Sequence, residues 1–368
     1  MLRGESSIIG LCLRLWRGKR RTQLSYWPVS AAACLAMVVG LVVLTSCSGK
    51  RSSPASAQTE PEQVWPAAPE PARIAYLGSV HRPADMGIKR SAFVRFSQWL
   101  TGSDKGNEAL NKPFGIALDE EDNLCLTDTG ANTVSYYNKT TRKWSRWDKV
   151  GKVRFVSPVA VAKKKGVLYV ADSGRGSVVA FDETGKLLFE TAKQLKRPAG
   201  LVISGERLLV ADSQRHCVVV LDLQGSYLSE FGKRGKGKGE FNFPTHLATD
   251  WEGNLYVTDS MNSRIQILDE KGGYKGEVGS LGDSPGNFSR PKGVSVDSFG
   301  HIYAIDALFD NIQIFDRTGR LLLNLGASGS KAGEFWLPNG IAISRDNEIY
   351  ATDTYNHRVQ VFKYVGPS

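Results

Sequence analysis

Three segments decide the fold: NLYVTDSMNSRIQILD (254–269), HIYAIDALFDNIQIFD (301–316) and EIYATDTYNHRVQVFK (348–363). Each joins two short runs of β-branched and aromatic residues through a polar turn that follows an aspartate. Alternation with a period of two, bounded by turn residues, predicts a β-hairpin rather than a helix. Successive segments start 47 residues apart, so the hairpin is part of a longer repeated unit.

The unit occurs six times along the 368-residue chain. A proline opens each copy and an aspartate ends its second predicted strand, at intervals of 40 to 47 residues. Repeats of this length indicate a solenoid or a propeller, and four antiparallel strands per copy indicate a propeller blade. The prolines are Pro113, Pro158, Pro198, Pro244, Pro291 and Pro338, and the aspartates are Asp128, Asp172, Asp212, Asp259, Asp306 and Asp353.

These units resemble NHL repeats, which are marked by Pro-x-Gly-Ile/Val-Ala-x-Asp, Gly-x-Leu/Ile-Tyr-Val-x-Asp and Asn-x-Arg-Ile/Val-Gln-Val-Phe. The linkers that lead into the last three copies, at 232–244, 279–291 and 326–338, all read Gly-x2-Gly-x3-Gly-x-Phe-x2-Pro. The resemblance covers about residues 72–368. It implies an all-β, six-bladed propeller of the NHL type.

The ends of this region indicate how the ring closes. The last copy stops after its third strand, at 359–362, which would leave a sheet edge exposed. Residues 72–78 match the fourth-strand pattern of 227–232, so we expect them to complete the last blade. Apolar residues within 85–100 have helical spacing with basic residues opposite, which predicts one short amphipathic helix before blade 1. We expect that helix to pack on the propeller, and the alternative is a helix on a membrane surface.

The N-terminus has the pattern of an export signal. A basic cluster at 16–21 precedes a charge-free apolar run at 31–44, which is short for a membrane span. The run ends in Leu-Thr-Ser-Cys at 44–47, which resembles the bacterial lipobox. The resemblance implies that residues 1–46 are a lipoprotein signal peptide and that Cys47 is lipidated. The alternative is an uncleaved signal anchor with an incidental cysteine.

Residues 47–71 are rich in Pro, Ala, Ser and Glu, and such a stretch buries too little surface to offset its ordering entropy. We expect a disordered tether that holds the propeller off the membrane. Ser48 follows Cys47, and by resemblance to Gram-negative lipoproteins this favours the outer membrane. The predicted location is therefore the cell envelope, at the outer membrane or the periplasmic face.

Charge and cysteine usage restrict the partners. Half of the net charge of +10 lies in residues 1–46, so the propeller is only mildly basic and we expect no nucleic-acid partner. Cys125 and Cys217 lie in different copies at non-equivalent positions, which argues against a disulfide. We expect both to be buried thiols that act as small hydrophobic residues.

Two features of the sequence, the repeated aspartate and His246, could be interpreted as parts of a metal site. The repeated aspartate precedes a tight turn in every copy, where a carboxylate accepts backbone N–H groups, so we expect an architectural role. His246 stands where the other copies have Gly or Ala, on the strand that by resemblance lines the central channel. Zinc-dependent amidating lyases of related form bring three such histidines together, and calcium-dependent lactonases need converging Glu, Asn and Asp. This chain has one histidine at that position and none of those acids, so we predict no metal and no cofactor.

The loops after the repeated aspartates differ between copies, as a recognition face on a repeated scaffold should. We therefore expect a monomeric binding or scaffold module, without catalytic activity, that uses one propeller face to recognise envelope proteins or a ligand. The alternative is a metal-dependent lyase or hydrolase with its site in the channel. The predicted binding residues are Arg175, Arg215, His216, His246, Phe309, Asp310, Tyr355 and His357.

Overall fold

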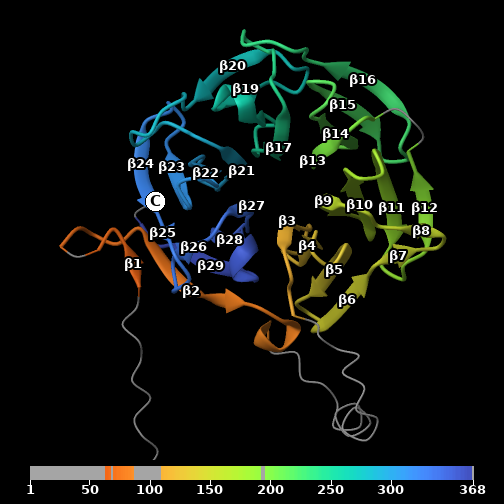
Figure 1. Cartoon of the computed structure of the whole chain (residues 1–368), viewed down its shortest axis with the longest axis horizontal. Coiled ribbons are helices and arrows are strands. Elements are labelled where there is room, and N and C mark those ends of the chain that lie inside the picture. Colours follow the sequence, from red (N-terminus) through yellow and green to blue (C-terminus); the bar gives the residue numbers. More distant parts are fainter. Residues whose placement is uncertain (1–62, 68, 87–108, 192–194, 367–368) are drawn as a thin grey trace, which may run out of the picture. The chain divides into compact units, whose positions relative to one another are not determined.

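The computed structural model describes residues 63–67, 69–86, 109–191 and 195–366, all within the unit Glu60–Ser368. Six antiparallel sheets stand around a central axis, with one strand of each sheet lining that axis (Figure 1). The fold prediction is confirmed, including closure of the ring by an N-terminal strand. The predicted signal peptide at 1–46 and the lipidated Cys47 lie outside the described residues.

Blades 1 to 5 each contain four strands that follow the chain from the axis outward. Blade 1 contains β3 (Pro113–Leu118), β4 (Leu124–Asp128), β5 (Thr133–Asn138) and β6 (Lys143–Trp147). Blade 2 contains β9 (Pro158–Lys164), β10 (Val167–Asp172), β11 (Ser177–Asp182) and β12 (Leu187–Glu190). Blade 3 contains β13 (Pro198–Ser204), β14 (Arg207–Asp212), β15 (Cys217–Asp222) and β16 (Tyr227–Phe231). Blade 4 contains β17 (Pro244–Thr249), β18 (Leu255–Asp259), β19 (Arg264–Leu268) and β20 (Tyr274–Val278). Blade 5 contains β21 (Pro291–Val296), β22 (Ile302–Asp306), β23 (Asn311–Phe315) and β24 (Leu321–Leu325).

Blade 6 joins the two ends of the described chain. Its order is β27 (Pro338–Ile343), β28 (Glu348–Asp353), β29 (Arg358–Tyr364), β2 (Ile74–Val80) and β1 (Val64–Trp65). The closing strand β2 pairs antiparallel with β29 and begins two residues after the predicted start at residue 72. Because the first and last segments share one sheet, the ring has no open seam at this blade.

The tether prediction for 47–71 does not hold at β1. Val64 and Trp65 pair with β2, and the Trp65 ring packs edge-on against Phe362 with 5.7 Å between centroids. Phe362 is fully buried, and burial of an aromatic surface of this size offsets the cost of ordering two residues. Val64 and Trp65 are the only sizeable apolar residues of this segment, and nothing in the neighbouring sequence indicates the contact of Trp65 with Phe362.

The remaining elements are short. The predicted helix at 85–100 lies outside the described residues except at Asp85 and Met86, which end the 3₁₀ helix η1 (Pro83–Met86). Within the described part of the chain, no helix is long and apolar enough to cross a membrane. The other elements are η2 (Ser260–Asn262), η3 (Thr354–Asn356), the hairpin β7 (Lys149–Val150) with β8 (Val153–Arg154), and the parallel pair β25 (Ala327–Ser328) with β26 (Glu334–Phe335).

The repeated linker has a packing explanation. Its phenylalanine is fully buried in each case, as Phe241, Phe288 and Phe335. Its first glycine has a positive φ and lies against that ring, so that a Cβ on Gly279 would lie 2.2 Å from the ring of Phe288. Only glycine satisfies both the backbone conformation and this close approach.

The cysteine prediction is confirmed. Cys125 and Cys217 are buried and free, and burial raises the pKa of the Cys217 thiol to about 11. Both thiols are therefore protonated at neutral pH and pack as hydrophobic side chains.

Candidate functional site: the Asp-loop face and the channel

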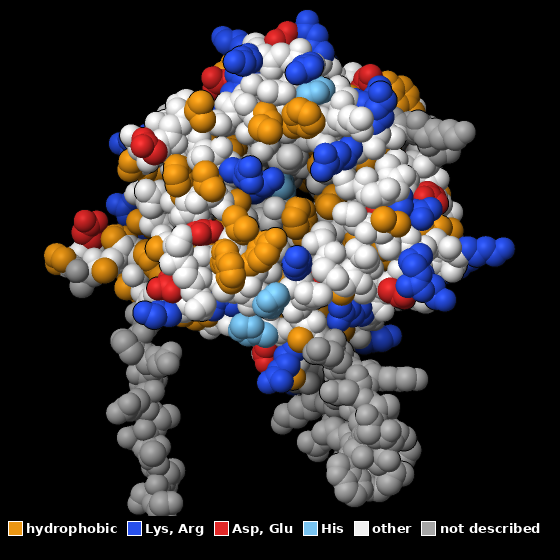
Figure 2. Space-filling view, viewed as in Figure 1, with side chains coloured by type: hydrophobic (Ala, Val, Ile, Leu, Met, Phe, Trp, Pro, Cys, Tyr) orange, Lys and Arg blue, Asp and Glu red, His pale blue; other side chains and the backbone are white. Residues whose placement is uncertain are grey.

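One face of the propeller carries the predicted binding residues. Each inner-strand proline pairs with the aspartate that ends the second strand, as Pro158 does with Asp172. The turns after the aspartates and the linkers before the prolines therefore lie at the same end of every blade. We call this surface the Asp-loop face, and it is the face seen in Figure 2.

The repeated aspartates are architectural, as predicted. Asp172 is fully buried and accepts hydrogen bonds from the N–H groups of Val156 at 2.8 Å and Ser157 at 2.9 Å. It also accepts from the turn N–H groups of Gly174 and Arg175. One carboxylate thus fixes both the turn and the linker before the inner strand, which accounts for its presence in every blade.

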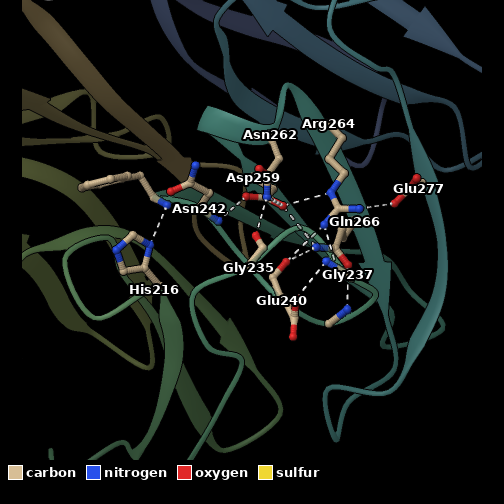
Figure 3. A network of polar contacts seen from close by, with 12 residues as sticks. His216, Gly235, Gly237, Glu240, Asn242, Asp259, Asn262, Arg264, Gln266 and Glu277 are labelled. Carbon is tan, nitrogen blue, oxygen red and sulfur yellow. Dashed lines mark hydrogen bonds and ion pairs between the residues drawn. The ribbon is translucent and has the colours of Figure 1, made fainter.

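Blades 4 and 6 add side chains to this arrangement, and Figure 3 shows those of blade 4. Asp259 accepts hydrogen bonds from Asn262 Nδ2 at 2.8 Å, Arg264 Nε at 2.9 Å and Gln266 Nε2 at 3.2 Å. Arg264 Nη2 donates in turn to the carbonyl of Gly237 in the linker. The same contacts recur in blade 6 among Asp353, Asn356, Arg358, Gln360 and Lys331. The Asn-x-Arg-x-Gln pattern therefore holds the linker to its own blade.

Three of the predicted binding residues form ties between blades. Each stands four positions after a repeated aspartate and has a positive φ. His216 Nδ1 accepts from the N–H of Phe243, and Asp310 Oδ1 accepts from the N–H of Leu337. His357 Nδ1 donates to the carbonyl of Asn111 and so connects blade 6 to the linker before blade 1. These ties account for the three side chains without a ligand.

The other predicted loop residues divide into two groups. Arg175 pairs with Glu190 at 2.8 Å and Arg215 pairs with Glu230 at 2.5 Å, each within one blade. Phe309 is half-buried, whereas Tyr355 is exposed and lies beside a neighbour that sequence reasoning missed. That neighbour is Trp336, whose ring centroid lies 5.7 Å from that of Tyr355.

Exposed apolar side chains gather on this face around a central hollow, with Lys and Arg side chains between them (Figure 2). The exposed fractions are 65% for Met261, 56% for Leu308 and 53% for Trp336. Sequence reasoning could have found them, because each stands two residues after a repeated aspartate or two before an inner-strand proline. Val156 and Tyr355 occupy the same two positions and are also exposed.

His246 lines the channel, as predicted. Its Nε2 lies 3.0 Å from Oδ1 of Asn339 in blade 6, so the two side chains meet across the axis. Burial lowers the pKa of His246 to about 3, and the positive charge of Lys292 acts in the same direction. The hydrogen bond to Asn339 raises the pKa but does not offset these two causes. The imidazole is therefore neutral at physiological pH.

At the opposite end the channel opens into a wider cavity of about 420 Å³. Its wall is mostly aliphatic, with Lys163 and Asp119 at one side. Lys163 is buried and pairs with Asp119 at 2.7 Å and Glu183 at 3.0 Å, and its ammonium lies 4.5 Å from the ring centre of Tyr136. Burial opposes the charge on Lys163, but its hydrogen bonds to the two acids outweigh burial and raise its pKa. Lys163 is thus a fully paired interblade contact.

The channel residues do not fit a metal ion. Among the described residues, no group of three or more His, Cys, Asp or Glu side chains is placed to hold one. The neighbours of His246 are an amide, Asn339, and a cation, Lys292. A cation beside the imidazole opposes binding of a second cation, and a catalytic zinc needs three protein ligands.

Comparison with known families agrees with this architecture. The NHL repeat profile matches residues 335–362, and a family described as 6-bladed beta-propeller matches residues 246–312. The chain is a six-bladed β-propeller with NHL-type repeats. No curated protein matches the sequence of the chain.

Solved structures with similar folds serve different functions. Virginiamycin B lyase from Staphylococcus aureus is 13% identical with a TM-score of 0.51, covering 69% of this chain and 96% of its own. A gluconolactonase from Xanthomonas campestris is 16% identical with a TM-score of 0.53, covering 69% and 86%. An auxiliary nutrient binding protein from Bacteroides thetaiotaomicron is 12% identical with a TM-score of 0.55, covering 70% of each chain. At these identities the likeness shows the fold alone.

Proposed function

We propose that this chain is a binding or scaffold module, tethered outside the cytoplasmic membrane, that recognises a protein of the cell envelope through its Asp-loop face. The supporting observation is the group of exposed apolar side chains Val156, Met261, Leu308, Trp336 and Tyr355 around the central hollow. Exposed apolar side chains gathered on one face among polar groups are typical of interaction sites. Trp and Tyr are among the residues that carry most binding energy at interfaces.

The charge of the face supports a partner with acidic side chains. Lys112, Arg197 and Arg290 each precede an inner-strand proline, and the ion pairs among the described residues include none of the three. Lys112 Nζ lies 5.0 Å from the ring centre of Tyr355, so one cation already stands beside the aromatic pair. Complementary charge would orient such a partner and speed its association.

The proposed tether rests on the sequence. The basic cluster, the apolar run and Cys47 form the pattern of a lipoprotein signal, and lipid attached to Cys47 would hold the propeller at the membrane. The chain between Cys47 and β1 would then be the tether that joins the lipid to the propeller. We do not propose the metal-dependent enzyme, because the charges and ligands around His246 oppose a metal.

Photocrosslinking in intact cells tests the proposal. A photoreactive amino acid replaces Leu308, which is 56% exposed on the Asp-loop face, or Trp251, which is 68% exposed in the turn after β17 at the opposite end. We expect a discrete crosslinked envelope protein from position 308 and none from position 251. Equal crosslinking from both positions, or crosslinking from 251 alone, would contradict the proposed face.

A further inference from the structure

The rim of the channel on the Asp-loop face is divided into an apolar half and a polar half. The residue after each inner-strand proline occupies this rim, and in blades 1 to 3 it is apolar. In blades 4 to 6 it is polar, and His246 lies one position deeper. In chain order, the six rim residues are Phe114, Val159, Ala199, Thr245, Lys292 and Asn339.

Lys292 in the polar half and the nearby Arg197 and Arg290 carry positive charge that no carboxylate balances. Among the described residues, no hydrogen bond or ion pair joins an acid to the side chain of Lys292, Arg197 or Arg290. Burial, and then the charges of Arg290 and Arg197, lower the pKa of Lys292. Arg290 and Arg197 are each close enough to Lys292 to repel its charge, and a bound anion would relieve that repulsion.

Two buried polar atoms in the polar half of the channel mouth lack protein partners. Neither Oγ1 of Thr245 nor Nδ1 of His246 is hydrogen-bonded to another protein group, although both atoms are buried. Buried polar groups in folded proteins nearly always have a partner. A hydroxyl can donate to an anion, and Nδ1 can do so when the amide of Asn339 turns to donate to Nε2.

The mouth of the channel on the Asp-loop face, inside the rim described above, has a closed floor. His246 lines a small cavity of about 40 Å³ between the inner strands. Six aliphatic side chains line both this cavity and the wide one at the opposite end, and so separate them. A charged group that enters from the Asp-loop face, past Lys292 at the rim, could go no deeper than this apolar ring. The ring consists of Ile116, Val161, Leu201, Leu247, Val294 and Ile341.

We propose that this mouth is an oxyanion site that takes one carboxylate or phosphate group. Lys292 pairs with the anion at the rim, Arg197 and Arg290 add charge from the face, and Thr245 donates a hydrogen bond. Charge-assisted bonds of this kind are about twice as strong as neutral ones. The inference rests on the proposed function, because the oxyanion site lies at the centre of the proposed binding face. The anion belongs either to a small ligand or to an acidic residue of the partner.

Calorimetric titration of the purified full chain with inorganic phosphate and with succinate tests the site. We expect at least one probe to bind, and we expect Lys292→Met to weaken its binding about tenfold or more. The control Lys152→Met removes an exposed lysine from the turn between β7 and β8 and should leave binding unchanged. If Lys292→Met does not fold, the double change Arg197→Gln and Arg290→Gln at exposed positions should weaken binding in the same way. Binding of neither probe, or equal binding by wild type and the folded variant, overturns the site.

The same material separates this inference from the proposed function. If neither probe binds while position 308 still crosslinks its partner, the oxyanion site is wrong and the binding face stands. If a probe binds but no partner is crosslinked, the oxyanion site stands and the proposed binding face is wrong. Saturating succinate should suppress crosslinking when the partner supplies the carboxylate, and should leave it unchanged when the anion is a separate small ligand.

Discussion

The architectural role of the repeated aspartates can be tested at Asp259. Asp259 is fully buried and accepts hydrogen bonds from the N–H of Asn242 at 2.6 Å and from Asn262, Arg264 and Gln266. In Asp259→Asn the side-chain NH2 would face a donor in either orientation, and Arg264 would lose its buried counter-ion. Breaking a buried pair in this way costs about 3–5 kcal/mol.

We expect the lower end of that range, because Arg264 keeps a second partner in Glu277 at 2.8 Å. Unfolding entropy of roughly 2.1 cal/mol/K per residue, over a propeller of roughly 300 residues, converts about 3 kcal/mol into a fall in Tm of about 5 °C. Circular dichroism during heating measures this fall. The matched control is Asp269→Asn in the same blade, which removes an exposed turn carboxylate and should change Tm much less.

A double-variant cycle makes the test sharper. If the loss comes from the uncompensated charge, adding Arg264→Met to Asp259→Asn should restore part of the lost stability. An Asp259→Asn protein as stable as wild type, or more stable, would refute the reasoning. That result would mean that the carboxylate is kept at a cost to stability, as ligand-binding and catalytic groups often are.

Three further predictions follow from the fold, the channel and the N-terminus. Of the described strands, a chain starting at residue 67 lacks only β1, and it should fold with a lower Tm. A chain starting at residue 81 also lacks β2 and should not yield a soluble monomer. A folded monomer from the shorter chain would contradict closure by β2. The folded-state pKa of His246 is about 3 and its ordinary value is 6.5, so protonation favours the unfolded chain below pH 6.5. The stability of wild type relative to His246→Asn should therefore fall between pH 7 and pH 5 in urea unfolding, and a constant difference would count against a buried neutral imidazole. Cys47→Ser should release the protein from membranes and abolish labelling by a fatty-acid probe, and unchanged labelling would exclude the lipid anchor.

The sequence predicted the structure best at positions where a residue has the same structural role in every blade. The inner-strand prolines, the repeated aspartates and the Asn-x-Arg-x-Gln pattern could be interpreted because the same backbone geometry recurs. β1 was missed because Val64 and Trp65 are surrounded by polar residues and prolines. Only Phe362, which lies in the same blade but at the other end of the sequence, shows what Trp65 packs against. Such a long-range contact leaves no local pattern.

The binding residues were harder to predict for a related reason. Variation between blades was interpreted as recognition, but His216, Asp310 and His357 vary because each ties its turn to a different neighbouring linker. The rim cations were overlooked because a single lysine or arginine before a proline is unremarkable in one copy. Aligning the six prolines would have shown that the polar rim residues fall in consecutive blades.

Recognition through the Asp-loop face is tested most directly by the affinity of the crosslinked envelope protein for two tryptophan variants. Trp336 is 53% exposed on that face, and Trp251 is 68% exposed in the turn after β17 at the opposite end. The account predicts that Trp336→Ala raises the dissociation constant by about tenfold or more, as loss of an aromatic anchor does, and that Trp251→Ala leaves it unchanged. Equal effects of the two changes, or a loss confined to Trp251→Ala, would contradict it.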